Sequence, residues 1–163
     1  MSESIQILEN VSKEEQYKNI VSQFKFLIEG EKNEISNMAN FCALLKEVFN
    51  PLWVGFYIIE DQELVLGPFQ GPIACTRIAF GKGVCGRAWQ ENKIIIVDDV
   101  DLFPGHIACS SLSKSEIVLP FYFKDKIMGV LDLDSINIAE FDQIDHFYLN
   151  ELLKIMESNR FNH

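Results

Sequence analysis

Side chains that alternate with a period of two constrain the fold of this chain most. Along residues 52–60, mostly apolar side chains alternate between two rows, one for each face of a strand. This alternation is typical of a β-strand. A short polar turn leads from there into a second strand over 63–69, and residues 114–123 and 126–134 form another hairpin. Two hairpins of this kind predict an antiparallel sheet.

Helical patterns stand before and after these hairpins. A Ser-x-x-Glu capping box at 12–15 opens a first helix that we expect to end at Gly30. A second helix runs from about Asn33 until Pro51 stops it, and a final helix begins at Asp142. Helices at both ends of the chain therefore have to pack against the sheet.

The middle of the chain is interrupted. It holds short strands at 76–80 and 94–97, a short helix over 83–92, and a long loop over 98–113. The whole order of elements predicts an α+β sandwich of helices on an antiparallel sheet. Since no linker, repeat or low-complexity stretch divides the chain, we expect one domain over 1–163.

Charge and hydropathy exclude several classes of function. The net charge of −10 argues against binding to nucleic acid and against binding to an anionic membrane, because both are negatively charged. The N-terminus lacks a basic segment followed by an apolar one, and the apolar runs are far shorter than a membrane span. We therefore expect a cytoplasmic protein, where disulfides are usually transient and catalytic.

Three cysteines, Cys75, Cys85 and Cys109, lie in stretches rich in Gly, Pro or Ser. Such segments expose side chains and often carry function, so the three thiols predict thiol chemistry. The fourth, Cys42, falls on the apolar stripe of the second helix, where we expect it to pack as a small core side chain.

The neighbours of two of these thiols suggest reactivity. Cys85 falls in the first turn of the short helix near Lys82 and Arg87, and helix amides with nearby cations favour a thiolate. Cys109 is followed by Ser110, in a loop whose backbone N–H groups can bind a carboxylate or an oxyanion. We therefore count Ser110 among the candidate substrate-binding residues.

A zinc site made of the three thiols and His106 is the rival interpretation. Nine residues separate Cys75 from Cys85, and twenty-three separate Cys85 from Cys109. Structural zinc sites use closely spaced pairs such as Cys-x2-Cys, which disfavours zinc here. A nucleophile–His acyl transferase is weaker still, so we expect no bound metal.

Three carboxylates gather in the last hairpin. Asp132 and Asp134 share one face of their strand. A three-residue turn over 124–126 sets Glu116 opposite Asp134 on that face, whereas a two-residue turn would move Glu116 to the other face. We favour the first register, which gives an acidic pocket for a substrate ammonium. A solvated strand end and a divalent-metal site remain open as alternatives.

Trp53 and Tyr57 share one face of the first strand. Core packing is the ordinary role of such residues. The alternative is an aromatic wall for a small ligand, because aromatic faces hold cations and sulfur groups well.

Five segments in order give the chain a family resemblance. It resembles the free methionine-(R)-sulfoxide reductases, which are built on a GAF domain, over nearly its whole length. The turn over 124–126 lacks the Gly that is common in GAF domains. The segments that carry the resemblance are 67–75, 81–89, 106–111, 115–120 and 129–135.

The resemblance implies a six-stranded antiparallel sheet flanked by helices on both sides. It also implies that Cys109 is the catalytic nucleophile, Cys75 its resolving partner and Cys85 the third family cysteine. The substrate-binding and catalytic carboxylates implied are Glu116, Asp132 and Asp134, and the aromatic pocket residues are Trp53 and Tyr57.

The activity implied is reduction of free L-methionine (R)-sulfoxide through a cysteine sulfenic acid and an intramolecular disulfide. No cofactor would be bound, and thioredoxin would act as the external reductant. The alternative is a non-catalytic GAF sensor of a small molecule or of oxidants. Sensors of this type are usually fused to output domains and need no acidic pocket. The sequence leaves the oligomeric state open, with a homodimer among the options.

Overall fold

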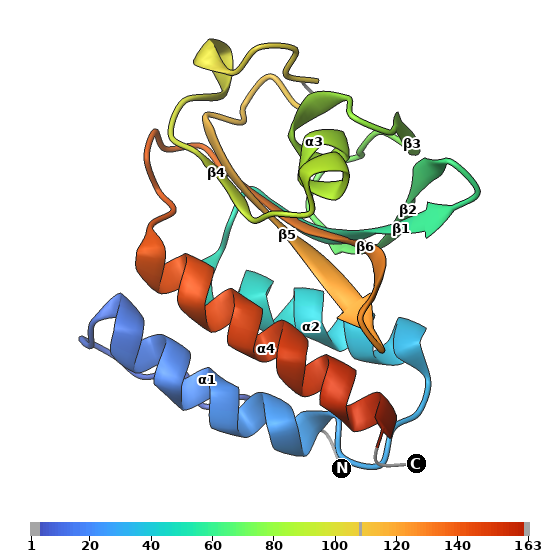
Figure 1. The fold of residues 1–163 in the computed structure, drawn as a ribbon. Helices are drawn as coiled ribbons and strands as arrows, with labels where there is room; N and C mark the ends of the chain where they lie inside the picture. Colours follow the sequence, from blue (N-terminus) through green and yellow to red (C-terminus); the bar gives the residue numbers. More distant parts are fainter. Residues whose placement is uncertain (1–3, 108, 162–163) are drawn as a thin grey trace.

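A computed structural model describes residues 4–107 and 109–161 (Figure 1). Six antiparallel strands form one sheet in the order β3-β2-β1-β6-β5-β4, so the two hairpins lie side by side at its centre. The strands are β1 (Trp53–Glu60), β2 (Glu63–Gln70), β3 (Arg77–Ala79), β4 (Ile95–Val97), β5 (Ser115–Phe123) and β6 (Lys126–Ser135). The helices are α1 (Lys13–Leu27), α2 (Glu34–Phe49), α3 (Gly83–Glu91), α4 (Gln143–Phe161) and the 3-10 turn η1 (Val100–Leu102).

Helices cover both faces of the sheet, which confirms the predicted architecture. On one face α2 packs across β1 and β2 and α4 packs on β5, while α1 lies outside them, mainly against α4 (Figure 1). On the opposite face the short helix α3 packs over β5 and β6.

The ends of the first two helices follow the predicted caps. The capping box at 12–15 is formed, and Asn33 accepts a hydrogen bond from the backbone of Ser36. Asn50 ends α2 in a left-handed conformation just before Pro51. The first helix ends at Leu27, slightly earlier than predicted, with Gly30 at a positive φ in the following turn.

Side chains of each central strand divide between two cores. In β1, Val54 and Phe56 enter the larger core under α1, α2 and α4, whereas Trp53 and Tyr57 enter the smaller core under α3. Cys42 is fully buried in the larger core, as predicted. The strand alternation seen in the sequence therefore separates a structural face from the face that carries the site.

The turn of the β5–β6 hairpin was predicted incorrectly, although its register was predicted correctly. The turn is two residues long, Lys124 and Asp125, both at positive φ. A two-residue turn alone would reverse the faces, but Met128 forms a bulge that restores the pairing. Glu116 consequently lies opposite Asp134.

Candidate functional site

One pocket lies on the face of the sheet that α3 covers. It has a volume of about 40 Å³ and is closed by the loops before β3 and before β5. Most of the predicted site residues line it. They are Trp53, Tyr57, Cys85, Cys109, Ser110, Glu116, Asp132 and Asp134.

The remaining predicted residue, Cys75, is bonded to Cys109. Their Cα atoms lie 5.7 Å apart, within the range of a disulfide. Cys109 is exposed, whereas Cys75 is half-buried and its carbonyl accepts a hydrogen bond of 2.8 Å from the hydroxyl of Tyr57. Since both sulfurs are used in this bond, the rival zinc quartet is not assembled in this form of the protein.

Two of the three carboxylates are deeply buried. Glu116 on β5 is 5% exposed and Asp132 on β6 is 6% exposed. Burial, followed by the charge of Asp134, raises the pKa of both Glu116 and Asp132 well above the usual range. The pKa of Asp134 is also raised, chiefly by burial, although a hydrogen bond from Ser113 opposes the rise. Burial therefore favours the protonated form of these carboxyl groups.

Asp132 also carries an unsatisfied acceptor. Within the described part of the chain, its buried Oδ1 has no hydrogen-bond partner. A buried polar atom without a partner is costly, so the site is suited to a ligand that brings a donor.

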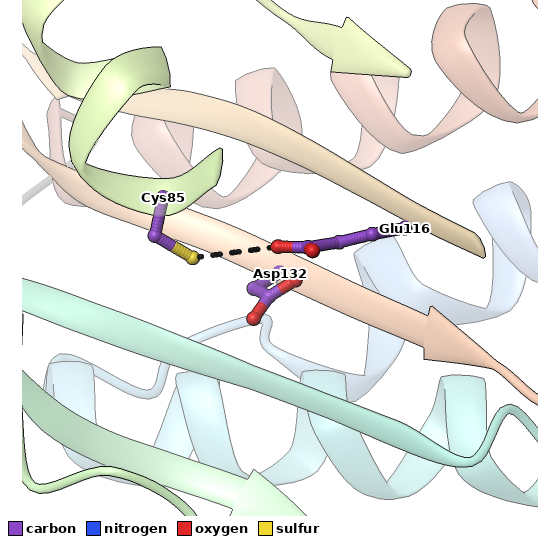
Figure 2. Close-up of side chains that lie close together, drawn as sticks. All are labelled: Cys85, Glu116 and Asp132. Atoms are coloured by element: carbon purple, nitrogen blue, oxygen red, sulfur yellow. Dashed lines mark hydrogen bonds between the residues drawn. The ribbon is translucent and has the colours of Figure 1, made fainter. Parts of the chain in front are cut away.

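The prediction of a thiolate at Cys85 is wrong. Cys85 does lie in the first turn of α3, but it is only 3% exposed and faces the acids (Figure 2). Burial, followed by the nearby charges of Asp132 and Glu116, raises the pKa of this thiol far above its ordinary value. Its Sγ donates a weak hydrogen bond of 3.9 Å to Oε1 of Glu116.

The charges that act on the Cys85 thiol are those of the acids, and the two cations expected to favour its thiolate are not among them. Lys82 is exposed, and the guanidinium of Arg87 lies over the ring of Phe103 at 4.8 Å. Ligand atoms of Cys85, Glu116 and Asp132 lie within 4.8 Å of one another, a spacing that a metal ion could also use.

Trp53 and Tyr57 line the pocket and also pack in the smaller core. Their rings stack with centroids 5.8 Å apart, and Trp53 Nε1 donates to the carbonyl of Pro72 at 3.1 Å. Gly55 makes this arrangement possible, since a Cβ there would lie 2.3 Å from the Trp53 ring.

Sequence reasoning missed two polar contacts from the loop that carries Cys109. Nε2 of His106 lies 3.4 Å from Oε2 of Glu116, and Ser113 donates to Asp134. Strand periodicity could not reveal either contact, because the path of a loop is not periodic. Ser110 lines the pocket as predicted, and its hydroxyl accepts a hydrogen bond from the backbone of Leu112.

Among the described residues, no helix combines the length and the apolar character needed to cross a membrane.

Comparisons with known proteins agree with this geometry. Residues 38–157 match the family model of the GAF domain. GAF domain-containing protein A of Dictyostelium discoideum is 58% identical over 97% of this chain and 100% of its own length. The free methionine-R-sulfoxide reductase of Escherichia coli is 45% identical over 90% of each chain. The structure of the Neisseria meningitidis free methionine-R-sulfoxide reductase in complex with its substrate is 46% identical, covers 97% of this chain and 96% of that one, and superposes with a TM-score of 0.91.

Proposed function

This chain belongs to the free methionine-R-sulfoxide reductase family and carries its GAF domain, and we propose that it reduces free methionine-R-sulfoxide to methionine. The observation that carries the proposal is the shared pocket of Cys109 and the three carboxylates. A sulfur nucleophile beside protonated acids supplies what sulfoxide reduction requires.

The first step joins sulfur to sulfur. The thiolate of Cys109 attacks the sulfoxide sulfur while a carboxylic acid protonates the sulfoxide oxygen. The protonated oxygen then passes to Sγ of Cys109, leaving methionine and a cysteine sulfenic acid. The substrate sulfur gains two electrons and Cys109 loses two, so no further reductant is needed for this step.

We assign the proton donor to Glu116. Its pKa is raised well above the usual range, and it accepts a hydrogen bond from Cys85. Asp132, with an unpartnered oxygen, and Asp134 would hold the substrate ammonium. The backbone N–H groups around Ser110 would face the substrate carboxylate. Trp53 and Tyr57 would contact the methyl and the sulfur.

The second step gives the bond seen in this structure. The thiol of Cys75 displaces the oxygen of the sulfenic acid as water and forms the Cys75–Cys109 disulfide. A protein dithiol such as thioredoxin would then return both cysteines to thiols by exchange.

Recognition of the free amino acid follows from the charges in the pocket. A methionine sulfoxide inside a peptide has neither an ammonium nor a carboxylate. Binding it would leave buried counter-charges unpaired, which is the kind of penalty that gives strong discrimination. We therefore expect protein-bound methionine sulfoxide to be rejected.

The test is a coupled assay with thioredoxin, thioredoxin reductase and NADPH. The wild-type protein is expected to consume NADPH with free L-methionine-R-sulfoxide, and Cys109→Ser is expected to be inactive. Cys42→Ala is the matched control, because Cys42 lies in the other core and its loss leaves the site thiols in place. Full activity of Cys109→Ser would contradict the proposal. A wild-type protein that forms the disulfide with peroxide but never turns over methionine sulfoxide would favour the sensor instead.

A further inference from the structure

His106 connects the edge of the pocket to the buried acid. Nε2 of His106 lies 3.4 Å from Oε2 of Glu116, and the side chains are 13% and 6% exposed. His106 precedes Cys109 by three residues on the same loop, and both line the pocket. His106 therefore belongs to the loop that carries the nucleophile, while its imidazole contacts the buried acid.

The proposed reaction needs a proton to move between these two places. Cys109 must lose its thiol proton before it attacks, and Glu116 must regain a proton after each transfer to the sulfoxide oxygen. Overall, one thiol and one sulfoxide give one sulfenic acid and one sulfide, with no net uptake of protons. Each turnover therefore releases one proton at Cys109 and requires one proton at Glu116.

We propose that His106 relays this proton, taking it up on the Cys109 side of the pocket and passing it to Oε2 of Glu116. This inference rests on the proposed reductase function. An imidazole suits the task because its two nitrogens accept and donate at different edges of the ring. Since His106 acts through Glu116, it is a positioning and relay residue and does not itself react with the substrate.

Acidic side chains predominate among the charged groups that share the pocket with His106. The titratable and charged groups that share the pocket with it are Glu116 from β5, Asp132 and Asp134 from β6, Lys82 and Cys85 at the start of α3, and Cys109 of its own loop.

A structural role of the His106 imidazole can be distinguished experimentally from a role in proton transfer. The turn at His106 is held by its backbone, whose N–H donates to the carbonyl of Phe103 at 3.1 Å. Removal of the imidazole leaves that hydrogen bond in place. We therefore expect His106→Ala to fold and to keep its substrate affinity.

The experiment is a single-turnover measurement on fully reduced protein mixed with free methionine-R-sulfoxide from about pH 6 to about pH 9. Loss of a positioned proton-transfer group is expected to slow the reaction about a hundredfold, most strongly at low pH, where solvent removes the thiol proton of Cys109 least readily. Added imidazole is expected to restore most of the rate in His106→Ala. His146→Ala is the matched control, because His146 lies on α4, across the sheet from the pocket.

The outcomes separate the two claims. If the wild-type protein does not reduce the substrate, the proposed function fails before the relay is tested. If the wild-type protein is active, a His106→Ala rate within about twofold of wild type overturns the relay. A slower variant whose rate is independent of pH and unaffected by imidazole also overturns it, since a structural defect alone gives that result.

Discussion

The four cysteines of this chain differ because of what surrounds each thiol. Cys42 is buried in the larger core, where its Sγ donates to the carbonyl of Pro68 at 3.4 Å, and burial raises its pKa to about 12. Cys85 is buried against two acids, while Cys109 is exposed on a loop and bonded to Cys75. Loop composition correctly marked Cys75 and Cys109 in the sequence. It failed at Cys85, because a helix position carries no information on which strands lie beneath it.

Cys75→Ser is expected to stop after one turnover. The reduced variant still has Cys109 and the carboxylates, so it can form methionine and a sulfenic acid. Without Cys75 the sulfenic acid has no resolving thiol, and Cys85 is buried away from the surface. Quenched samples should contain about one methionine per protein molecule. Repeated turnover at the wild-type rate would show that another cysteine resolves the intermediate, and Cys42→Ala is again the control.

Asp132→Asn is expected to change the pH dependence of stability. Because the pKa of Asp132 is raised in the folded protein, the folded protein still holds a proton at pH values where the unfolded chain has already released it. The free energy of unfolding therefore falls as pH rises above the ordinary aspartate range. Asn cannot ionise, so the variant should gain more stability relative to wild type at about pH 8 than at about pH 5 in urea titrations.

The same substitution should weaken binding of the free substrate at least about tenfold, since a bound ammonium favours the ionised form of Asp132 and Asn cannot ionise. Asp98→Asn, at an exposed position outside the pocket, is the control for both measurements. A wild-type pH profile in Asp132→Asn would mean that Asp132 is ionised in the folded protein.

At the scale of elements, the β5–β6 hairpin shows where sequence reasoning reached its limit. Apolar pairing was sufficient to predict that Glu116 faces Asp134. It could not distinguish a three-residue turn from a two-residue turn with a bulge at Met128, because both give the same pairing beyond the bulge. The carboxylate cluster was therefore predicted correctly with an incorrect turn.

Replacing Lys124 by Asn and Asp125 by Gly is expected to stabilise the protein. Both positions have positive φ, and Asn-Gly is strongly preferred in two-residue hairpin turns. We expect a gain of about 1 kcal/mol, measured by urea unfolding. Activity should be unchanged, because the turn lies at the opposite end of β5 and β6 from Glu116 and Asp134. A loss of stability would contradict the assigned turn geometry.

At the scale of the whole molecule, the layers could be predicted because each strand sorts its side chains by face. The closing of the pocket could not, since it depends on loops that run from β2 to β3 and from β4 to β5. The outer position of α1 was also not predicted. A buried hydrogen bond of 2.7 Å from the hydroxyl of Tyr17 to Asp145 fixes α1 to α4 there.

Tyr17→Phe is expected to loosen this attachment. Tyr17 is 1% exposed, and its loss leaves Oδ1 of the buried Asp145 without that donor. The expected cost is about 1–3 kcal/mol of unfolding free energy. Tyr148→Phe is the matched control, because its hydroxyl contacts Glu14 at the surface and should contribute less than about 0.5 kcal/mol. Equal effects of the two variants would contradict the role given to Tyr17.

The central claim is that a sulfur nucleophile works beside an acidic pocket built for an ammonium. The most direct test compares kcat/KM for free methionine-R-sulfoxide with that for its N-acetyl derivative, which keeps the sulfoxide and the carboxylate. We expect N-acetylation to lower kcat/KM by at least about a hundredfold, because the buried acids lose their counter-charge. Equal values for the two substrates would contradict the account.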